Sequence, residues 1–175
     1  MRLTLRCHPQ TPCDAVKRIE VVVERPKPGG LALHYFVTGT IADVLLPSPA
    51  APTRSEGLWE HSCFEAFLRP TAGSAYHEFN FAPSTRWAAY AFKRYREGRI
   101  DAEVEPPVIE ASAHAGSYEL RATLNFPMGM PAELGLSAVI EDTNGRKSYW
   151  ALAHPPGGPD FHHEDCFALQ LPPAA

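Results

Sequence analysis

The stretch "SYELRATLNF" (residues 117–126) alternates strictly between polar and apolar side chains. Successive side chains of a β-strand point to opposite faces, so this period of two predicts a strand with one face on a core and the other in water. Antiparallel sheets commonly show this division. The apolar face would carry Tyr118, Leu120, Ala122, Leu124 and Phe126. This stretch therefore predicts an antiparallel β protein.

Similar segments occur along the chain. "RIEVVVER" (18–25) and "LALHYFVTGT" (31–40) flank "PKPGG", which predicts a hairpin with a glycine-rich turn. "LGLSAVIED" (134–142) and "KSYWALA" (147–153) flank "TNGR". The Asn-Gly pair predicts a type I′ turn, whose two central positions both need positive φ. "CFALQL" (166–171) predicts a final strand.

The connecting segments are rich in proline, and the 18 prolines of the chain favour short elements and many turns. Residues 42–57 are predicted to be a surface loop, and residues 96–116 a polar link with one short strand. Residues 86–98 fit a helix as well as a strand, and we predict a strand because the neighbouring segments are strands. About ten strands then predict an antiparallel two-sheet β-sandwich or jelly roll.

Composition narrows the classes of function. The chain has 175 residues and a net charge of −4, which predicts one domain spanning residues 1–175 with no general attraction to nucleic acid or anionic membranes. No apolar run is long enough for a signal peptide or a membrane span, so the expected location is cytoplasmic. The four cysteines lack zinc-finger spacing and are expected to be thiols.

Glu65 is the most unusual polar residue, because it lies inside the apolar run "CFEAFL" (63–68). A buried carboxylate costs several kcal/mol unless it is paired or hydrogen-bonded. Either Arg69 or Arg86 is its partner in a structural ion pair, or Glu65 contacts a ligand.

The following strand carries a polar row. Tyr76, Glu78 and Asn80 share one face, and the other face carries His77, Phe79 and Phe81. A row of phenol, carboxylate and amide groups suits hydrogen bonding to a polyhydroxylated ligand, although a solvated face would show the same pattern. The tryptophans, Trp59, Trp87 and Trp150, could stack on sugar rings or pack in the core.

A family resemblance favours the ligand-binding alternative. The run "WEHSCFEAFL" (59–68), followed by "YHEFNF" (76–81) and "WAAY" (87–90), resembles the bacterial DOMON-like proteins of the MurB-associated branch, which are related in fold to the family 9 carbohydrate-binding modules. The later "LSAVIED", "SYWALAHP" and "PDFHHEDCF" resemble the same branch, so the resemblance covers most of the chain.

The resemblance implies a two-sheet β-sandwich that binds a sugar or a haem on one face. In the sugar-binding relatives a tryptophan pair encloses the ring, and Glu, Asn and Arg side chains hold its hydroxyl groups. Glu65, Glu78, Asn80 and Trp87 are the best matches to that pattern. With Trp59, Tyr76 and Arg86 they make up the predicted ligand-binding set.

The stretch "HPPGGPDFHHEDCF" (154–167) offers His154, Asp160, His162 and His163 as metal ligands. It contains neither His-Glu-x-x-His nor Cys-x-x-Cys, and its prolines and glycines favour a loop that leads into the last strand. Haem binding would need an axial ligand such as His154 together with Met128 or Met130.

No strong catalytic motif is present: the chain lacks a nucleophile elbow, a P-loop and a dinucleotide-binding glycine pattern. Glu65 and Glu78 could form a glycosidase pair only with a suitable spacing of their carboxyl groups. The sequence therefore favours a non-catalytic module that binds a small, saccharide-like molecule. A metal- or haem-binding protein and a protein-interaction domain are the alternatives.

Overall fold

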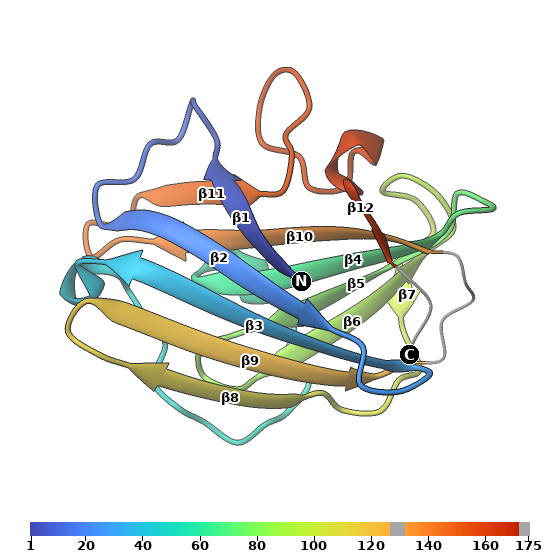
Figure 1. Cartoon of the computed structure of the whole chain (residues 1–175), viewed down its shortest axis with the longest axis horizontal. Coiled ribbons are helices and arrows are strands. Elements are labelled where there is room, and N and C mark those ends of the chain that lie inside the picture. Colours follow the sequence, from blue (N-terminus) through green and yellow to red (C-terminus); the bar gives the residue numbers. More distant parts are fainter. Residues whose placement is uncertain (127–131, 172–175) are drawn as a thin grey trace.

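The computed structural model describes residues 1–126 and 132–171 and consists almost wholly of β-strands (Figure 1). Three 3-10 turns interrupt them in the described residues, and no helix there is long and apolar enough to cross a membrane. The strands are β1 (Arg2–Cys7), β2 (Val16–Glu24), β3 (Gly30–Gly39), β4 (Cys63–Pro70), β5 (Tyr76–Phe81), β6 (Trp87–Phe92), β7 (Ile100–Asp101), β8 (Val108–Ala113), β9 (Ser117–Asn125), β10 (Ala132–Glu141), β11 (Lys147–Ala151) and β12 (Leu169–Leu171); the 3-10 turns are η1 (Ile41–Asp43), η2 (Leu58–Glu60) and η3 (Glu164–Cys166).

The strands form one continuous antiparallel sheet in the order β7-β6-β5-β4-β10-β11-β1-β2-β3-β9-β8, and β12 adds to β10. The sheet curls on itself, so that β2, β3, β9 and β8 (the front half, with β1) face β10, β4, β5 and β6 (the rear half, with β7, β11 and β12) (Figure 1). The predicted all-β antiparallel fold is confirmed. The predicted division into two sheets is not, because β1 pairs with both β2 and β11.

The main core lies between the two halves. Leu33 and Tyr35 of β3 and Leu120 of β9 are fully buried from the front half, and Phe64 of β4 and Phe79 of β5 from the rear half. The Phe64 ring centroid lies 5.0 Å from that of Tyr35, so the two halves are in direct aromatic contact. Complete burial of such a side chain contributes about 1.5–3 kcal/mol.

The two halves differ on their outer faces. In β9 of the front half, buried residues such as Leu120 alternate with exposed ones such as Arg121. In β4 of the rear half, every residue from Cys63 to Leu68 is buried. The outer face of the rear half is covered by a second apolar cluster, made of Phe67, Tyr76, Ala88, Tyr90, Phe92, Val139, Ala151, Phe161 and Phe167. This cover explains why β4 reads as an apolar run rather than as an alternating strand.

The predicted strand segments are present, with shifted ends. The segments at 18–25 and 31–40 form the β2–β3 hairpin, and the ambiguous segment at 86–98 is a strand as far as Phe92. The link at 96–116 holds two strands, β7 and β8, rather than one. The final strand begins only at Leu169, because η3 precedes it.

Two local features differ from expectation. The β10–β11 turn is not type I′, since Gly145 has positive φ (78°) and Asn144 does not. The Asp142 carboxylate instead accepts hydrogen bonds from the backbone N–H groups of Asn144 and Arg146, at 2.9 and 3.0 Å, which supports a different turn. Strand β1, which joins the two halves, was not predicted, although its sequence "RLTLRC" alternates between polar and apolar residues.

Candidate functional site

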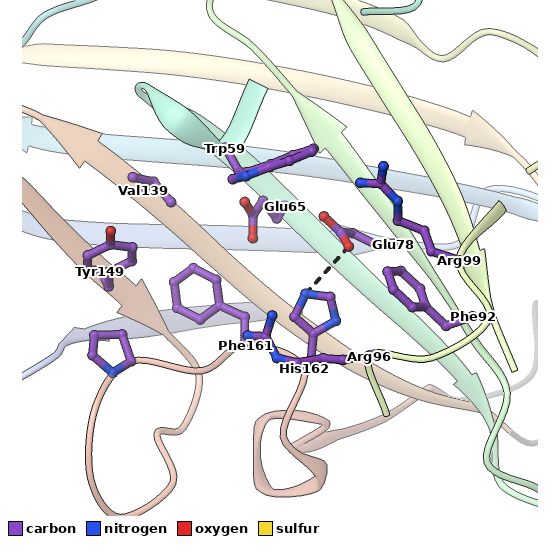
Figure 2. Close-up of a pocket in the computed structure, with 11 residues that line it drawn as sticks. Trp59, Glu65, Glu78, Phe92, Arg96, Arg99, Val139, Tyr149, Phe161 and His162 are labelled. Carbon is purple, nitrogen blue, oxygen red and sulfur yellow. Dashed lines mark ion pairs between the residues drawn. The ribbon is translucent and has the colours of Figure 1, made fainter. Parts of the chain in front are cut away.

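A cavity of about 430 Å³ opens on the outer face of the rear half. Strands form its floor, and its walls come from η2, the β6–β7 connection and the loop before β12 (Figure 2). Its lining residues are Trp59, Glu65, Glu78, Phe92, Arg96, Arg99, Val139, Tyr149, Pro159, Phe161 and His162.

Glu65 reaches this floor because of its register in β4. Its neighbours Phe64 and Ala66 belong to the core between the halves, so alternation turns Glu65 to the outer face. It stands opposite Ser137 of β10 and Asn80 of β5. Ser137 Oγ donates to Glu65 Oε2 at 3.1 Å, and the residue is 3% exposed. Glu65 is therefore held by a neutral donor.

The sequence predicted Arg69 or Arg86 as the partner in an ion pair with Glu65, and both candidates are wrong. The Arg69 guanidinium binds Glu133 at 2.6 Å, because these residues face each other across β4 and β10. Arg86 is exposed just before β6. Glu65 has no salt bridge within residues 1–126 and 132–171.

Glu78 lies on β5, two residues before Asn80 and on the same face. Asn80 Nδ2 donates to Glu78 Oε1 at 2.7 Å, and the other oxygen lies 3.7 Å from His162 Nε2. Figure 2 shows both carboxyl groups between the indole of Trp59 on one side and Phe161 and His162 on the other. Glu65 and Glu78 are thus diagonal neighbours on a single surface.

Burial raises the pKa of Glu65 well above its ordinary value, and the negative charge of Glu78 raises it further. Burial also raises the pKa of Glu78, against the opposing effects of the Asn80 hydrogen bond and the charges of Arg99 and Arg96. The pair therefore holds a proton more tightly than two exposed carboxylates would.

An aromatic and cationic group forms the wall above the carboxylates. The Trp59 and Tyr90 rings pack edge to face with centroids 5.8 Å apart. The Arg99 guanidinium lies 4.7 Å from the Tyr90 ring centroid and 5.7 Å from that of Trp59. Glu56 binds both the Tyr90 hydroxyl and Arg99, at 2.8 Å each, so Arg99 already has a carboxylate partner.

The loop before β12 forms the opposite wall. Arg96 pairs with Asp160 at 2.7 Å, and Tyr76 Oη lies 2.7 Å from His162 Nδ1. Because Tyr76 Oη also accepts from the Arg96 backbone N–H at 3.1 Å, its own proton is available to His162 Nδ1. Burial, with a smaller contribution from the charge of Arg96, lowers the pKa of His162 to about 4. The imidazole is therefore neutral at pH 7.

The structure brings together most of the residues that were predicted to bind a ligand. Trp59, Glu65 and Glu78 line the cavity, Asn80 holds Glu78, and Tyr76 holds His162. Trp87 and Arg86 lie elsewhere. Trp87 is 4% exposed on the inner face of β6, where the Arg54 guanidinium lies 4.4 Å from its ring centroid.

Other lining residues were not expected. Arg96 and Arg99 come from the polar link, where no pattern marked them, although Arg96 adopts a positive φ of 53°. Phe161 and His162 come from the histidine-rich stretch, which the sequence predicted to be a loop leading into the last strand, with a metal site as the alternative. Both residues lie in the cavity wall.

The candidate metal ligands do not converge. His154 Nε2 donates to the Arg6 carbonyl at 2.8 Å, His163 accepts from the Asp165 N–H at 3.2 Å, and Asp160 is paired with Arg96. Among the described residues, no group of three or more His, Cys, Asp and Glu side chains could hold a metal ion. Met128 and Met130, the haem-ligand candidates, lie outside the described residues.

A second cavity, of about 490 Å³, adjoins the first. His162 lines both cavities, and Tyr76 lines the second. The remaining lining residues are Arg69, Ser74, Arg94, Tyr95, Glu97, His163, Glu164 and Phe167. The Tyr76–His162 hydrogen bond therefore forms part of the partition.

No protein-family model matches the chain, and no curated protein matches it. Among solved structures, a candidate carbohydrate-binding protein from Bacteroides uniformis is similar, with a TM-score of 0.63 and 17% identity over 95% of this chain and 83% of that one. Two structures of a family 9 carbohydrate-binding module from Caldicellulosiruptor kristjanssonii also match. The glucose complex has a TM-score of 0.46 and 12% identity (80% of this chain, 69% of that one), and the cellotriose complex 0.48 and 11% (85% and 75%). The Bacteroides structure shares the all-β fold.

Proposed function

We propose that the chain is a binding domain that holds a saccharide in the cavity of the rear half without altering it chemically. The observation that carries this proposal is the pair of buried carboxyl groups, Glu65 and Glu78, at the floor of a cavity with aromatic walls. A volume of about 430 Å³ falls within the range of small-molecule pockets.

The lining suits both surfaces of a sugar ring. A sugar presents hydroxyl groups around its edge and C–H groups on its faces. Glu65 and Glu78 accept hydrogen bonds from hydroxyl groups, and a hydrogen bond to a charged group is worth about 1.5–3 kcal/mol. The indole of Trp59 and the ring of Phe161 offer flat apolar surfaces for the ring faces.

The comparisons are consistent with this proposal and do not carry it. The Bacteroides protein of the same fold is described as a candidate carbohydrate-binding protein. Membership of the DOMON-like, MurB-associated branch is part of the proposal and rests on the sequence resemblance alone.

Isothermal titration calorimetry with neutral and amino mono- and disaccharides tests the proposal. We expect binding by at least one sugar, and at least a tenfold loss of affinity in Trp59→Ala, since stacking surface is removed. Phe36→Ala is the matched control, because Phe36 is a partly exposed aromatic residue on β3 of the front half. If no sugar binds, or if Trp59→Ala binds as tightly as the wild type, the proposal fails.

Glycoside hydrolysis is the second candidate, because the paired carboxyl groups with raised pKa values are the groups that such chemistry uses. Incubation of the titrated sugars as nitrophenyl glycosides separates the two functions. If the wild type releases nitrophenol and both Glu65→Gln and Glu78→Gln fail to do so, the proposed function becomes glycoside hydrolysis rather than binding alone. We expect no release above that of the double variant.

A further inference from the structure

The cavity carries an uncompensated negative charge. Its two arginines already have carboxylate partners: Arg96 pairs with Asp160 at 2.7 Å, and Arg99 with Glu56 at 2.8 Å. Among the described residues that line the cavity, none is a lysine. Among the described residues, Glu65 and Glu78 therefore form no salt bridge with a lysine or arginine, and His162, 3.7 Å from Glu78, is neutral at pH 7.

Each carboxyl group also keeps one oxygen unbound by a protein donor. Ser137 Oγ reaches Glu65 Oε2, and Asn80 Nδ2 reaches Glu78 Oε1. Within the described parts of the chain, Glu65 Oε1 makes no hydrogen bond, and Glu78 Oε2 has only the long approach of His162 Nε2 at 3.7 Å. Both residues are at least nine-tenths buried, at 3% and 5% exposure. Each carboxyl group can therefore accept a further hydrogen bond from a ligand.

The walls of the cavity favour a cation as that donor. Trp59, Phe92, Tyr149 and Phe161 surround the carboxyl groups with aromatic rings. Aromatic faces attract ammonium groups electrostatically, and more strongly where water is excluded. The carboxyl groups supply the opposite charge in the same space. A hydroxyl group would satisfy the hydrogen bonds but would leave the charge uncompensated.

We propose that the ligand is a saccharide with a free ammonium group, an amino sugar, whose nitrogen lies between Glu65 and Glu78; this rests on the saccharide-binding function proposed above. Diagonal positions on neighbouring strands lie about 7–8 Å apart at Cα, which lets two glutamate side chains reach one ammonium group. The rest of the ring would lie against Trp59 and Phe161.

Ammonium binding would also move a proton. Burial raises the pKa of both carboxyl groups, and the charge of Glu78 raises that of Glu65 further, which favours a proton held by the pair. The charged groups that face them are Arg96 and Asp160 from one wall, Arg99 and Glu56 from the other, and neutral His162. When an ammonium group enters and a proton held by the pair leaves to solvent, the pair gains one negative charge and the ammonium group supplies one positive charge, so the net charge of the site stays the same.

Calorimetry with matched ligands tests this inference directly on the wild type. Glucose is compared with glucosamine and N-acetylglucosamine, and cellobiose with the β-1,4-linked dimer of glucosamine. At pH 7 we expect the amine of each set to bind at least tenfold more tightly than its neutral counterparts. In buffers with different enthalpies of ionisation, the amine should release protons on binding and the neutral sugar should not.

Substitution of each glutamate tests whether these two side chains produce the preference for the amine. Glu65→Gln and Glu78→Gln should each reduce the affinity for the amine about tenfold or more and reduce that for the neutral sugar much less. Glu141→Gln is the control, since Glu141 is buried on β10 but bound to His61 outside the cavity. If a glutamine variant fails to fold, the ligand pairs on the wild type still decide the question.

The outcomes separate this inference from the proposed function. A neutral sugar that binds as tightly as its amine overturns the ammonium site and leaves saccharide binding intact. The absence of binding by every sugar overturns both. If methylamine binds as tightly as glucosamine, the cavity recognises an amine without a saccharide, and the assignment to an amino sugar fails.

Discussion

The strands in the front and rear halves of the sheet both turn alternate side chains to opposite faces, yet the outer faces of the two halves differ in solvent exposure. On β9 of the front half, Glu119 lies on the outer face at the surface and pairs with His34 at 2.9 Å. On β4 of the rear half, Glu65 also lies on the outer face but is 3% exposed. The difference is the cover that η2, the β6–β7 connection and the loop before β12 add to the rear half. A polar row becomes a candidate site only where other segments close over it.

The largest expected effect on the free energy of unfolding comes from removing an aromatic ring from the core. Phe64 is fully buried between the halves, and Phe36 is only partly buried on the outer face of β3. We expect Phe64→Ala to lower the free energy of unfolding by about 3–5 kcal/mol, because it leaves a cavity in the core. Phe36→Ala should cost no more than about 1 kcal/mol. Urea denaturation measures both, and equal costs would contradict the contrast between the inner core and the bare outer face.

The next effect concerns the charge on Glu65. Its pKa is raised in the folded protein, by burial first and by the charge of Glu78 second. The stability that the proton contributes is therefore fully present below the pKa of the unfolded chain, about 4.3, and is lost as the pH rises through the folded value. Glu65→Gln cannot ionise and should escape this loss. At pH 8 we expect the variant to be more stable than the wild type by about 1–4 kcal/mol.

The measurement is a series of denaturation curves above pH 6.5. Below pH 6.5 His162 also affects the stability. Its pKa is lowered to about 4 in the folded protein, so its contribution to the free energy of unfolding falls as the pH drops from 6.5 toward 4. Glu110→Gln, on the exposed outer face of β8, should change stability by less than about 0.5 kcal/mol at every pH. A loss of several kcal/mol in Glu65→Gln would mean that the carboxylate has a cationic partner after all.

The fold was largely predictable because alternation is a local property. The segment at 117–126 has a period of two, and β9 follows it closely. The position of β1 was not predictable in this way. Its six residues, "RLTLRC", also alternate, but alternation does not identify partner strands, and their pairing with β2 and β11 joins the halves through contacts distant in sequence.

The site was predictable only in part. A charge inside an apolar run identified Glu65 correctly as a buried group, because burial of a charge needs a reason. Trp87 was placed in the ligand set by resemblance, but its position in β6 turns it to the core. Arg96, Arg99 and Phe161 enter the cavity through connections whose path depends on tertiary packing, for example the Arg96–Asp160 pair. No local pattern encodes such a path.

A smaller effect tests how the core supports the floor of the cavity. Tyr35 Oη of the front half donates to the Glu65 carbonyl at 2.8 Å, and Ser137 Oγ donates to the Glu65 side chain. We expect Tyr35→Phe to cost about 1–2 kcal/mol of stability and leave sugar affinity within about twofold, since it loses one buried hydrogen bond. Ser137→Ala should change affinity more than Tyr35→Phe does. The reverse order, measured by calorimetry, would place the ligand-sensing contact in the core.

The smallest effect should appear in the loop that closes the cavity. Asp160 holds this loop through Arg96 at 2.7 Å, Tyr95 at 2.5 Å and the His162 N–H at 3.2 Å. The Arg96 side chain is 51% exposed, so water weakens the pair, and Asp160→Asn should cost at most about 1 kcal/mol in global stability. Hydrogen exchange resolves the local consequence: amides in residues 154–167 should exchange faster in the variant, whereas those of β2 and β3 should not change. Uniform acceleration across the sheet would show that the loop is part of the main core, and the distinction between a covered rear face and a bare front face would then lose its energetic basis.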